Sequence, residues 1–429
     1  MGQGVLTAGF GRVDGALACE GVALSAIADA VGTPVYVYSS AIVRDRFRRL
    51  DGAMEGLPHR VHYTLKANSN AGILRILREQ GAGVDVVSGG ELHRARRAGF
   101  AGGDIIFGGV GKTERELREA LEAGVLLVNA ESEAEVRLLD RVAGALGVVA
   151  PVGLRVNPEV TVDSSHRYIK TGEKGAKFGI PFDDVRAVAL VAASLPHVRL
   201  VGLDMHIGSQ LFRLDPYLDG TERLLGLLAR LRADGVDTIR YLDIGGGLGV
   251  SYDAEEAPDV ERFAAAIVAR VADAGVTLLM EPGRFIVGNA GVLVTRVLYR
   301  KHGGGRDFLV TDAGMTELIR PSHYDAYHRI DAVSRQAGQG RITADVVGPV
   351  CESGDFLALD RAMDDAQPGD LLAVHDVGAY GYVMASNYNS RPRGAEVVVD
   401  GERWAVVTVR ERYEDLVRLE QDEPEWRMA

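Results

Sequence analysis

Short apolar runs recur along the first two thirds of the chain, and longer segments with helical periodicity separate them. Eight of these runs read as strands buried on both faces: 61–67, 83–89, 104–109, 126–130, 152–158, 200–208, 239–247 and 277–283. Several intervening segments have acidic first turns and terminal glycines, as helices do: 89–100, 112–124, 132–147 and 261–275. The alternation predicts parallel strands joined by crossover helices.

Eight βα units in about 230 residues have the number and size of a TIM barrel, and an open, doubly wound sheet is the alternative. In a TIM barrel, catalytic groups lie at the carboxyl ends of the strands. Polar or unusual residues gather at these ends here: Lys66, Ser88, Gly108, Asn129, Asn157, His206, Gly245 to Gly247, Glu281 and Arg284.

The remainder of the chain has a different pattern. From about residue 290, β-branched runs alternate with turns rich in Gly, Pro and Asp, which is typical of an all-β domain. We therefore expect an α/β plus all-β protein, with a TIM (β/α)8 barrel over 30–285 and a C-terminal β-sandwich or β-barrel domain over 286–429. The N-terminal segment 1–29 is a candidate to join the second domain.

Composition narrows the class of protein. The chain of 429 residues is 47% hydrophobic, carries a formal net charge of −12 and has a pI near 5.4. An acidic protein is a poor partner for nucleic acid or an anionic membrane. Two cysteines, Cys19 and Cys351, cannot form a disulfide framework, and no run reaches the roughly 20 apolar residues of a membrane span. These features predict a cytoplasmic protein.

Lys66 is the first candidate for chemistry, because the sequence HYTLKANSN places it where a buried strand ends. Such a lysine can form a salt bridge, contact a phosphate or act as a Schiff-base nucleophile, and desolvation would favour the last by lowering its pKa. The glycine-rich DIGGGLGV follows the seventh strand, where barrels often bind phosphate. Its backbone N–H groups are unobstructed by side chains, which suits a phosphate.

A lysine, a phosphate loop and the carboxylate of Glu281 together suit pyridoxal 5'-phosphate. The lysine would bond to the cofactor, the glycines would hold its phosphate, and Glu281 would pair with the ring nitrogen. His206 could stack on the ring face. No metal-binding set of residues is predicted.

Seven segments in order carry a resemblance to a known family: YTLKAN, HIGSQ, DIGGGLGVSY, EPGRFIV, TDAGMTELIRPSHYDAYH, GPVCESGD and GAYGYVMASNYNSRPR. Over about residues 25–415 the chain closely resembles the diaminopimelate decarboxylases. These are alanine-racemase-like, fold type III pyridoxal phosphate enzymes, which pair a TIM barrel with a β domain. The resemblance implies decarboxylation of meso-2,6-diaminopimelate to L-lysine, the last step of lysine biosynthesis.

The resemblance also implies roles for individual residues. Lys66 would carry the cofactor, and its other contacts would come from His206, Ser209, Gly246, Gly247, Glu281, Gly283, Arg284 and Tyr380. The substrate would meet Arg284, Arg320, Tyr324 and Tyr380. In the homodimer that it implies, Cys351 and Glu352 would come from the partner subunit, as the proton donor and the anchor of the distal ammonium.

Arg320 favours a diaminopimelate decarboxylase over an ornithine or lysine decarboxylase, since the latter two need no arginine for a distal carboxylate. Departures from the family at His323 and Asp325 bear on fine substrate preference. The alternatives are a relative acting on another D-configured or carboxylated diamine and a non-catalytic pyridoxal phosphate carrier. An amino-acid racemase would need a second base. The long polar connection 161–180 is expected to act as a lid.

Overall fold

The computed structural model describes residues 9–161, 175, 177–335, 340–421 and 423–428. The predicted lid at 161–180 therefore lies largely outside the described residues. Within them the chain divides into two compact units. One comprises residues 40–290 and 378–383, and the other comprises the N-terminal residues to Ser39 together with 291–377 and 384–429. No helix of the described part combines the length and apolar composition that a membrane span requires.

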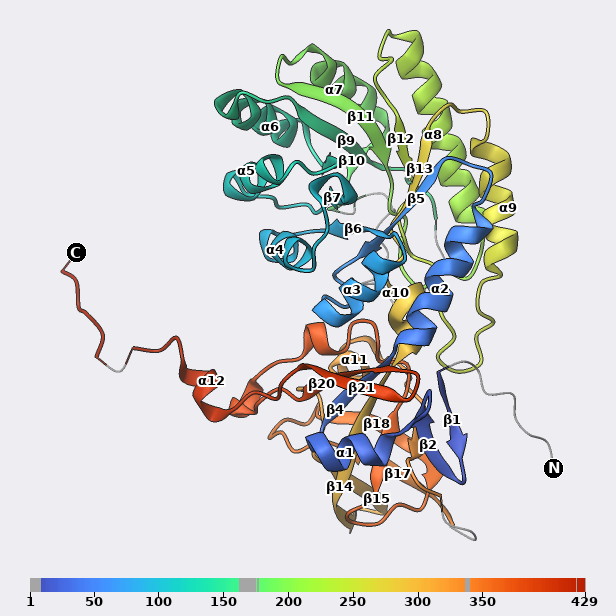
Figure 1. Cartoon of the computed structure of the whole chain (residues 1–429), viewed down its shortest axis with the longest axis vertical. Coiled ribbons are helices and arrows are strands. Elements are labelled where there is room, and N and C mark those ends of the chain that lie inside the picture. The colour runs from blue at the N-terminus through green and yellow to red at the C-terminus, as the bar shows by residue number, and fades with distance from the viewer. Residues whose placement is uncertain (1–8, 162–174, 176, 336–339, 422, 429) are drawn as a thin grey trace. The chain divides into compact units, whose positions relative to one another are not determined.

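The first unit is a closed ring of parallel strands, and Figure 1 shows its helices lying around the outside of the strands. In the described residues the ring runs through β5 (His59–Thr64), β6 (Gly83–Val86), β7 (Ile105–Phe107), β8 (Leu127–Ala130), β9 (Ala150–Asn157), β11 (Val198–Asp204), β12 (Tyr241–Asp243) and β13 (Thr277–Met280). All eight predicted strands are confirmed. The last pairs with the first, Leu278 opposite His59, and this closure excludes the open doubly wound sheet.

Local sequence signals set the helices between the strands. Ser88, Thr113 and Ser132 each accept a hydrogen bond from the backbone N–H three residues later, which caps a helix start. Gly124 and Gly147 end two helices in the left-handed conformation. The helices of this unit are α2 (Ser40–Ala53), α3 (Ala71–Glu79), α4 (Gly89–Arg97), α5 (Glu114–Ala123), α6 (Glu133–Leu146), α7 (Phe182–Ser194), α8 (Asp215–Ala233), α9 (Val260–Val271) and α10 (Arg284–Val287). Shorter elements are η1 (Gly102–Asp104), β10 (Ile180–Pro181), η3 (Gly288–Ala290) and η4 (Tyr382–Met384).

The second unit is β-rich. Its main sheet has the order β18-β17-β15-β14-β4-β20-β21; β19 also pairs with β14, and β16 pairs with β19. The strands are β4 (Val35–Ser39), β14 (Gly291–Gly303), β15 (Arg306–Thr311), β16 (Ile330–Ala332), β17 (Arg341–Val347), β18 (Phe356–Asp364), β19 (Leu371–Val374), β20 (Ala395–Asp400) and β21 (Arg403–Thr408). A small sheet and the helices complete it: β1 (Phe10–Val13), β2 (Ala16–Cys19), β3 (Val22–Ala23), α1 (Leu24–Val31), α11 (Arg320–Tyr324), η5 (Tyr388–Ser390) and α12 (Tyr413–Val417).

Strand β4 differs from the expected division, because the sequence places it in the range 30–285 assigned to the barrel. In the structure it lies between β14, to which it is antiparallel, and β20, to which it is parallel. All five of its residues are buried, and Val35 and Val37 pack in a core with Leu24 and Ile27 of α1. A strand buried on both faces and paired along both edges belongs at the centre of a sheet, and this accounts for its continuous apolar sequence.

The barrel interior contains an apolar cluster made by Ile106, Leu127, Val201 and Leu279. Ile106 lies on β7 and Leu279 on β13, and these strands are separated in the ring by β5 and β6. Side chains from strands that do not pair can meet only across the interior. The cluster therefore fills the barrel, as expected of a packed core.

Leu279→Ala should lower the free energy of unfolding by about 2–5 kcal/mol, because Leu279 has no exposed surface and the substitution leaves a cavity in the apolar cluster. The measurement is chemical denaturation of the purified protein. The control is Leu190→Ala on α7, where the side chain is 39% exposed and the change should stay within about 0.5 kcal/mol. Equal losses for the two variants would contradict the assignment of Leu279 to the packed interior.

Candidate active site

The carboxyl ends of the barrel strands bring the sequence-predicted residues of this unit to one edge of the ring. Lys66 follows β5 by two residues, His206 follows β11 by two, Gly245 to Gly247 follow β12, and Glu281 comes directly after β13. The segment 378–383 also belongs to this unit, where the backbone N–H of Tyr380 donates to the carbonyl of Ala67 at 2.8 Å. A residue more than 300 positions away thus lies beside the Lys66 loop.

The glycine loop after β12 is packed too tightly for side chains. A Cβ on Gly246 would lie 2.1 Å from the carbonyl oxygen of Glu281, and one on Gly247 would lie 2.3 Å from that of Gly208. Gly247 also has a φ of +104°, which residues with a Cβ rarely adopt. The N–H of Gly246 donates to Nδ1 of His206 at 3.3 Å, so the loop and this histidine are joined directly.

Gly283 is a third glycine at which neighbouring atoms leave no room for a side chain. A Cβ there would meet the Cγ2 of Thr64 at 2.3 Å and the Cβ of Ala67 at 2.9 Å. The turn after β13 is therefore packed against the residues on either side of Lys66, and this contact fixes the spacing between Glu281 and the lysine loop.

Arg284 lies buried among hydroxyl groups and aromatic rings. It donates from Nη1 to the hydroxyl of Tyr252 at 2.7 Å and from Nη2 to Oγ of Ser209 at 3.3 Å. Its guanidinium carbon lies 4.7 Å from the centre of the Tyr380 ring. Ser209, Arg284 and Tyr380, all predicted from the sequence, are thus brought together.

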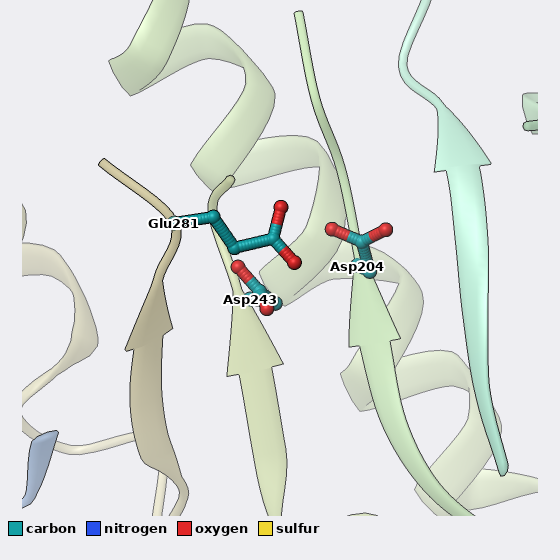
Figure 2. Close-up of side chains that lie close together, drawn as sticks. All are labelled: Asp204, Asp243 and Glu281. Carbon is teal, nitrogen blue, oxygen red and sulfur yellow. The ribbon is translucent and has the colours of Figure 1, made fainter. Parts of the chain in front are cut away.

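Carboxyl groups crowd the interior at the same edge. Figure 2 shows Asp204, Asp243 and Glu281 directed toward one another from β11, β12 and the turn after β13. Each offers an oxygen within 4.8 Å of the others, and all three side chains are buried. Asp85 on β6 belongs to the same charged layer and accepts a short hydrogen bond from the hydroxyl of Thr64.

Burial and mutual repulsion make these groups weak acids. Burial raises the pKa of Glu281 well above its usual range, and Asp243, Asp85 and Asp204 raise it further. Burial likewise raises the pKa of Asp204 to about 7, although Arg155 opposes the shift. Arg155 forms an ion pair of 2.8 Å with Glu131 and lies 4.0 Å from Asp204. The cluster has the spacing of a cation site, but Arg155 and Lys66 already supply positive charge to it.

The expectation that desolvation would lower the pKa of Lys66 is wrong for this protein without a ligand. Burial does oppose the charged form, but Tyr380, Asp85 and Glu281 outweigh it, and the pKa of Lys66 is raised. The reason is that the lysine faces several acidic groups and not an apolar pocket.

Sequence reasoning missed Asp85, Arg155, Asp204 and Asp243, although a signal was present. Asp204 precedes His206 by two residues, and Asp243 precedes Gly245 by two, which is the spacing of one face in the predicted runs 200–208 and 239–247. A charged residue at that spacing inside an otherwise apolar run marks the barrel interior. Tyr252 gives no comparable signal, because it lies in an irregular loop.

The remaining candidates lie in the β-rich unit. Arg320 begins α11 and is 6% exposed, and its guanidinium carbon lies 5.9 Å from the ring centre of Tyr324. Cys351 and Glu352 are exposed on the loop before β18. The N–H of Cys351 donates to Oδ1 of Asn389 at 3.0 Å, and Oε1 of Glu352 accepts from the N–H of Gly354 at 2.9 Å. Both side chains are thus presented on the surface of this chain by an ordered turn.

Comparisons with known proteins give the family. Residues 40–288 match the model for the pyridoxal binding domain of pyridoxal-dependent decarboxylases. The diaminopimelate decarboxylase of Pseudomonas aeruginosa is 51% identical over 408 residues, covering 95% of this chain and 97% of its own length. The chain belongs to the diaminopimelate decarboxylase family.

Solved structures agree with this assignment to the diaminopimelate decarboxylases. The enzyme of Helicobacter pylori complexed with L-lysine matches with a TM-score of 0.89 at 38% identity, covering 92% of this chain and 98% of that one. The enzyme of M. jannaschii, also with L-lysine, matches with a TM-score of 0.91 at 33% identity, covering 97% and 98%. The closed barrel with a separate β-rich unit is the fold of the family.

Pyridoxal phosphate is the cofactor of this family, and the residues at the strand ends fit it. The amine of Lys66 can bond to an aldehyde, and the loop of Gly245 to Gly247 lacks side chains where a phosphate needs backbone N–H groups. Glu281 is a buried carboxyl group, for which a pyridine nitrogen is a suitable partner. His206 contacts the glycine loop at Gly246, and Arg284 contacts Ser209.

Gly246→Ala and Gly247→Ala should each weaken cofactor binding by about 1–3 kcal/mol, because the added methyl group has to displace backbone. Titration of cofactor-free protein with pyridoxal phosphate, followed by visible absorbance, measures the effect. Gly226→Ala on α8 is the matched control, since its Cβ would meet nothing within 4 Å. Unchanged affinity in both loop variants would show that the loop does not hold the phosphate.

Asp204→Asn should reduce the pH dependence of stability in cofactor-free protein. Folding raises the pKa of Asp204 from about 4 to about 7, so the stabilisation is complete below pH 4 and is lost as the pH rises through 7. The loss is at most about 4 kcal/mol. Thermal unfolding at pH 5 and pH 8 should therefore show a smaller difference in Tm for the variant than for the wild type. The control, Asp273→Asn at an exposed position, should leave the difference in Tm between pH 5 and pH 8 unchanged. An unchanged difference in Asp204→Asn would refute the prediction.

Proposed function

We propose that this chain decarboxylates meso-2,6-diaminopimelate to L-lysine and CO2 with pyridoxal phosphate, as the last step of lysine biosynthesis. The observation that carries the proposal is the similarity to curated diaminopimelate decarboxylases along almost the whole chain, 51% over 95% of it in one case and 42% over 94% in another. The proposal includes a homodimer in the cytoplasm, in keeping with the acidic composition and the lack of a disulfide framework.

Bound pyridoxal phosphate supplies an electron-poor ring that accepts the electron pair left behind when a carboxylate departs as CO2. In this proposal Lys66 bonds to the cofactor, and the loop that contains Gly246 and Gly247 holds its phosphate. Glu281 keeps a proton at the ring nitrogen, and His206 lies against the ring face. A ring cation would also lower the pKa of Glu281, because it offsets the three neighbouring carboxyl groups.

The distal end of the substrate carries a second carboxylate and a second ammonium. Arg320 would bind the carboxylate through its planar fork, with Tyr324 beside it. Arg284 and Tyr380 would also contact the substrate. Glu352 of the partner subunit would bind the distal ammonium, and Cys351 of the partner subunit would donate the proton to the carbon that has lost CO2.

The direct test of function is an assay with four amino acids. The protein should release CO2 from meso-diaminopimelate and form L-lysine, and it should not release CO2 from lysine, ornithine or alanine. CO2 release and the chirality of the product are followed together. Activity on ornithine or lysine, or racemisation of alanine without CO2, would overturn the proposal in favour of a related enzyme, and inactivity on all four would favour a carrier.

Lys66 should carry the cofactor. Borohydride reduction of the loaded protein, followed by peptide mapping, should place the label on Lys66, and Lys66→Ala should abolish both the label and the visible absorption band. Lys112 provides the comparison, because its amine is almost fully buried and holds three oxygen atoms of the chain, among them Oε1 of Glu135 at 2.6 Å. A label on Lys112 or Lys177 would show that the assignment is wrong.

Mixed dimers should test whether each site uses two chains. If Lys66→Ala and Cys351→Ala subunits are each nearly inactive, random reassociation makes about half the dimers mixed, and each of these has one site with both lesions and one with neither. About a quarter of wild-type activity should return. A tag on one variant verifies mixing. Confirmed mixed dimers without activity would show that Lys66 and Cys351 serve the same chain's site.

A further inference from the structure

A buried histidine, His328, contacts Arg320, the arginine proposed to bind the distal carboxylate. Nε of Arg320 donates to Nε2 of His328 at 3.2 Å, and neither side chain is more than 6% exposed. Both residues belong to the β-rich unit, with Arg320 at the start of α11 and His328 two residues before β16. The hydrogen bond is made by Nε, the guanidinium nitrogen bonded to the aliphatic part of the side chain, and not by Nη1 or Nη2.

The partners of the imidazole settle its tautomer. An arginine N–H can only donate, so Nε2 of His328 has to be the acceptor and carries no proton. Nδ1 lies 2.9 Å from the carbonyl oxygen of His375, which can only accept. His328 is therefore neutral, with its proton on Nδ1. A protonated ring would direct a second N–H at Arg320 and could not make this contact.

The backbone carbonyls of His328 and Arg329 are both held by hydrogen bonds. The N–H of His375 donates to the carbonyl of Arg329 at 2.8 Å, continuing the pairing of β16 with β19. Nη1 of Arg361 donates to the carbonyl of His328 at 2.6 Å. A ring fixed by two strands and an arginine is a rigid acceptor.

We propose that His328 is a positioning residue that sets the orientation of Arg320 for the distal carboxylate. The inference rests on the proposed function, because it concerns the residue assigned there to substrate recognition. A guanidinium is planar, so a fixed acceptor at Nε limits rotation of the whole fork. Binding of a carboxylate by two parallel hydrogen bonds depends on that orientation. His328 reduces the conformational freedom that Arg320 would lose when the ligand binds.

Two substitutions at His328 separate positioning from simple packing. His328→Gln places an oxygen acceptor at about the reach of Nε2, whereas His328→Asn retains a donor near Nδ1 and is too short to reach Arg320. Arg320→Ala is the reference variant. The ligands are L-lysine, which carries the distal carboxylate, and cadaverine, which lacks it. Inhibition constants of both ligands are measured with the loaded enzyme, and the cofactor absorption spectrum is recorded for each variant.

Arg320→Ala should weaken the binding of L-lysine relative to that of cadaverine by about 10- to 100-fold, because a charged hydrogen-bonded pair is lost. His328→Asn should weaken it by about tenfold with an unchanged cofactor spectrum, and His328→Gln should restore most of the loss. The positioning role is overturned if Arg320→Ala weakens binding of L-lysine relative to cadaverine and His328→Asn does not. Equal loss of both ligands in His328→Asn also overturns it, since that result indicates general damage. If Arg320→Ala leaves the relative affinity for L-lysine and cadaverine unchanged, Arg320 does not bind the distal carboxylate, and the assignment in the proposed function is wrong.

Discussion

Burial of several carboxyl groups at one end of the barrel is the constraint on which the candidate site depends. Asp85, Asp204, Asp243 and Glu281 lie in the interior where water cannot solvate them, so they exist there only with protons or with cations beside them. Lys66 and Arg155 provide part of that charge. This positive charge does not offset their burial and mutual repulsion, so the pKa of Asp204 and the pKa of Glu281 are both raised.

This charge balance connects the cofactor to the amine that carries it. In the proposed function, a cationic ring beside Glu281 would allow that carboxyl group to ionise, while bonding to the cofactor would remove the free ammonium of Lys66. One positive charge near the carboxyl groups would then replace another. Tight contacts join the parts of this site, since Gly246 lies against the carbonyl of Glu281 and Gly283 lies against Thr64 and Ala67. The glycine loop, Glu281 and the loop of Lys66 are therefore packed directly against one another.

Much of the barrel could be predicted because its strands are continuous apolar runs and its helices have explicit caps, such as Ser88 and Thr113. Lys66, Glu281 and the three glycines stood out because each breaks the pattern at a strand end. The interior acids did not stand out, since a single Asp inside an apolar run also fits a turn or a salt bridge. The direction of the pKa shift of Lys66 could not be predicted either, because it depends on Tyr380 and Asp85, which only the fold brings near. The place of β4 was equally hidden, as its partners come from the other end of the sequence.

The position of β4 has a consequence for how the chain is made. Synthesis proceeds from the N-terminus, and all eight strands of the barrel are complete once Met280 has been added. The central strand of the β-rich sheet is among the first segments made, yet its parallel neighbour β20 begins only at Ala395. An apolar strand with two open edges invites wrong pairing until its partners arrive. The barrel strands are therefore complete before β4 can pair with β20.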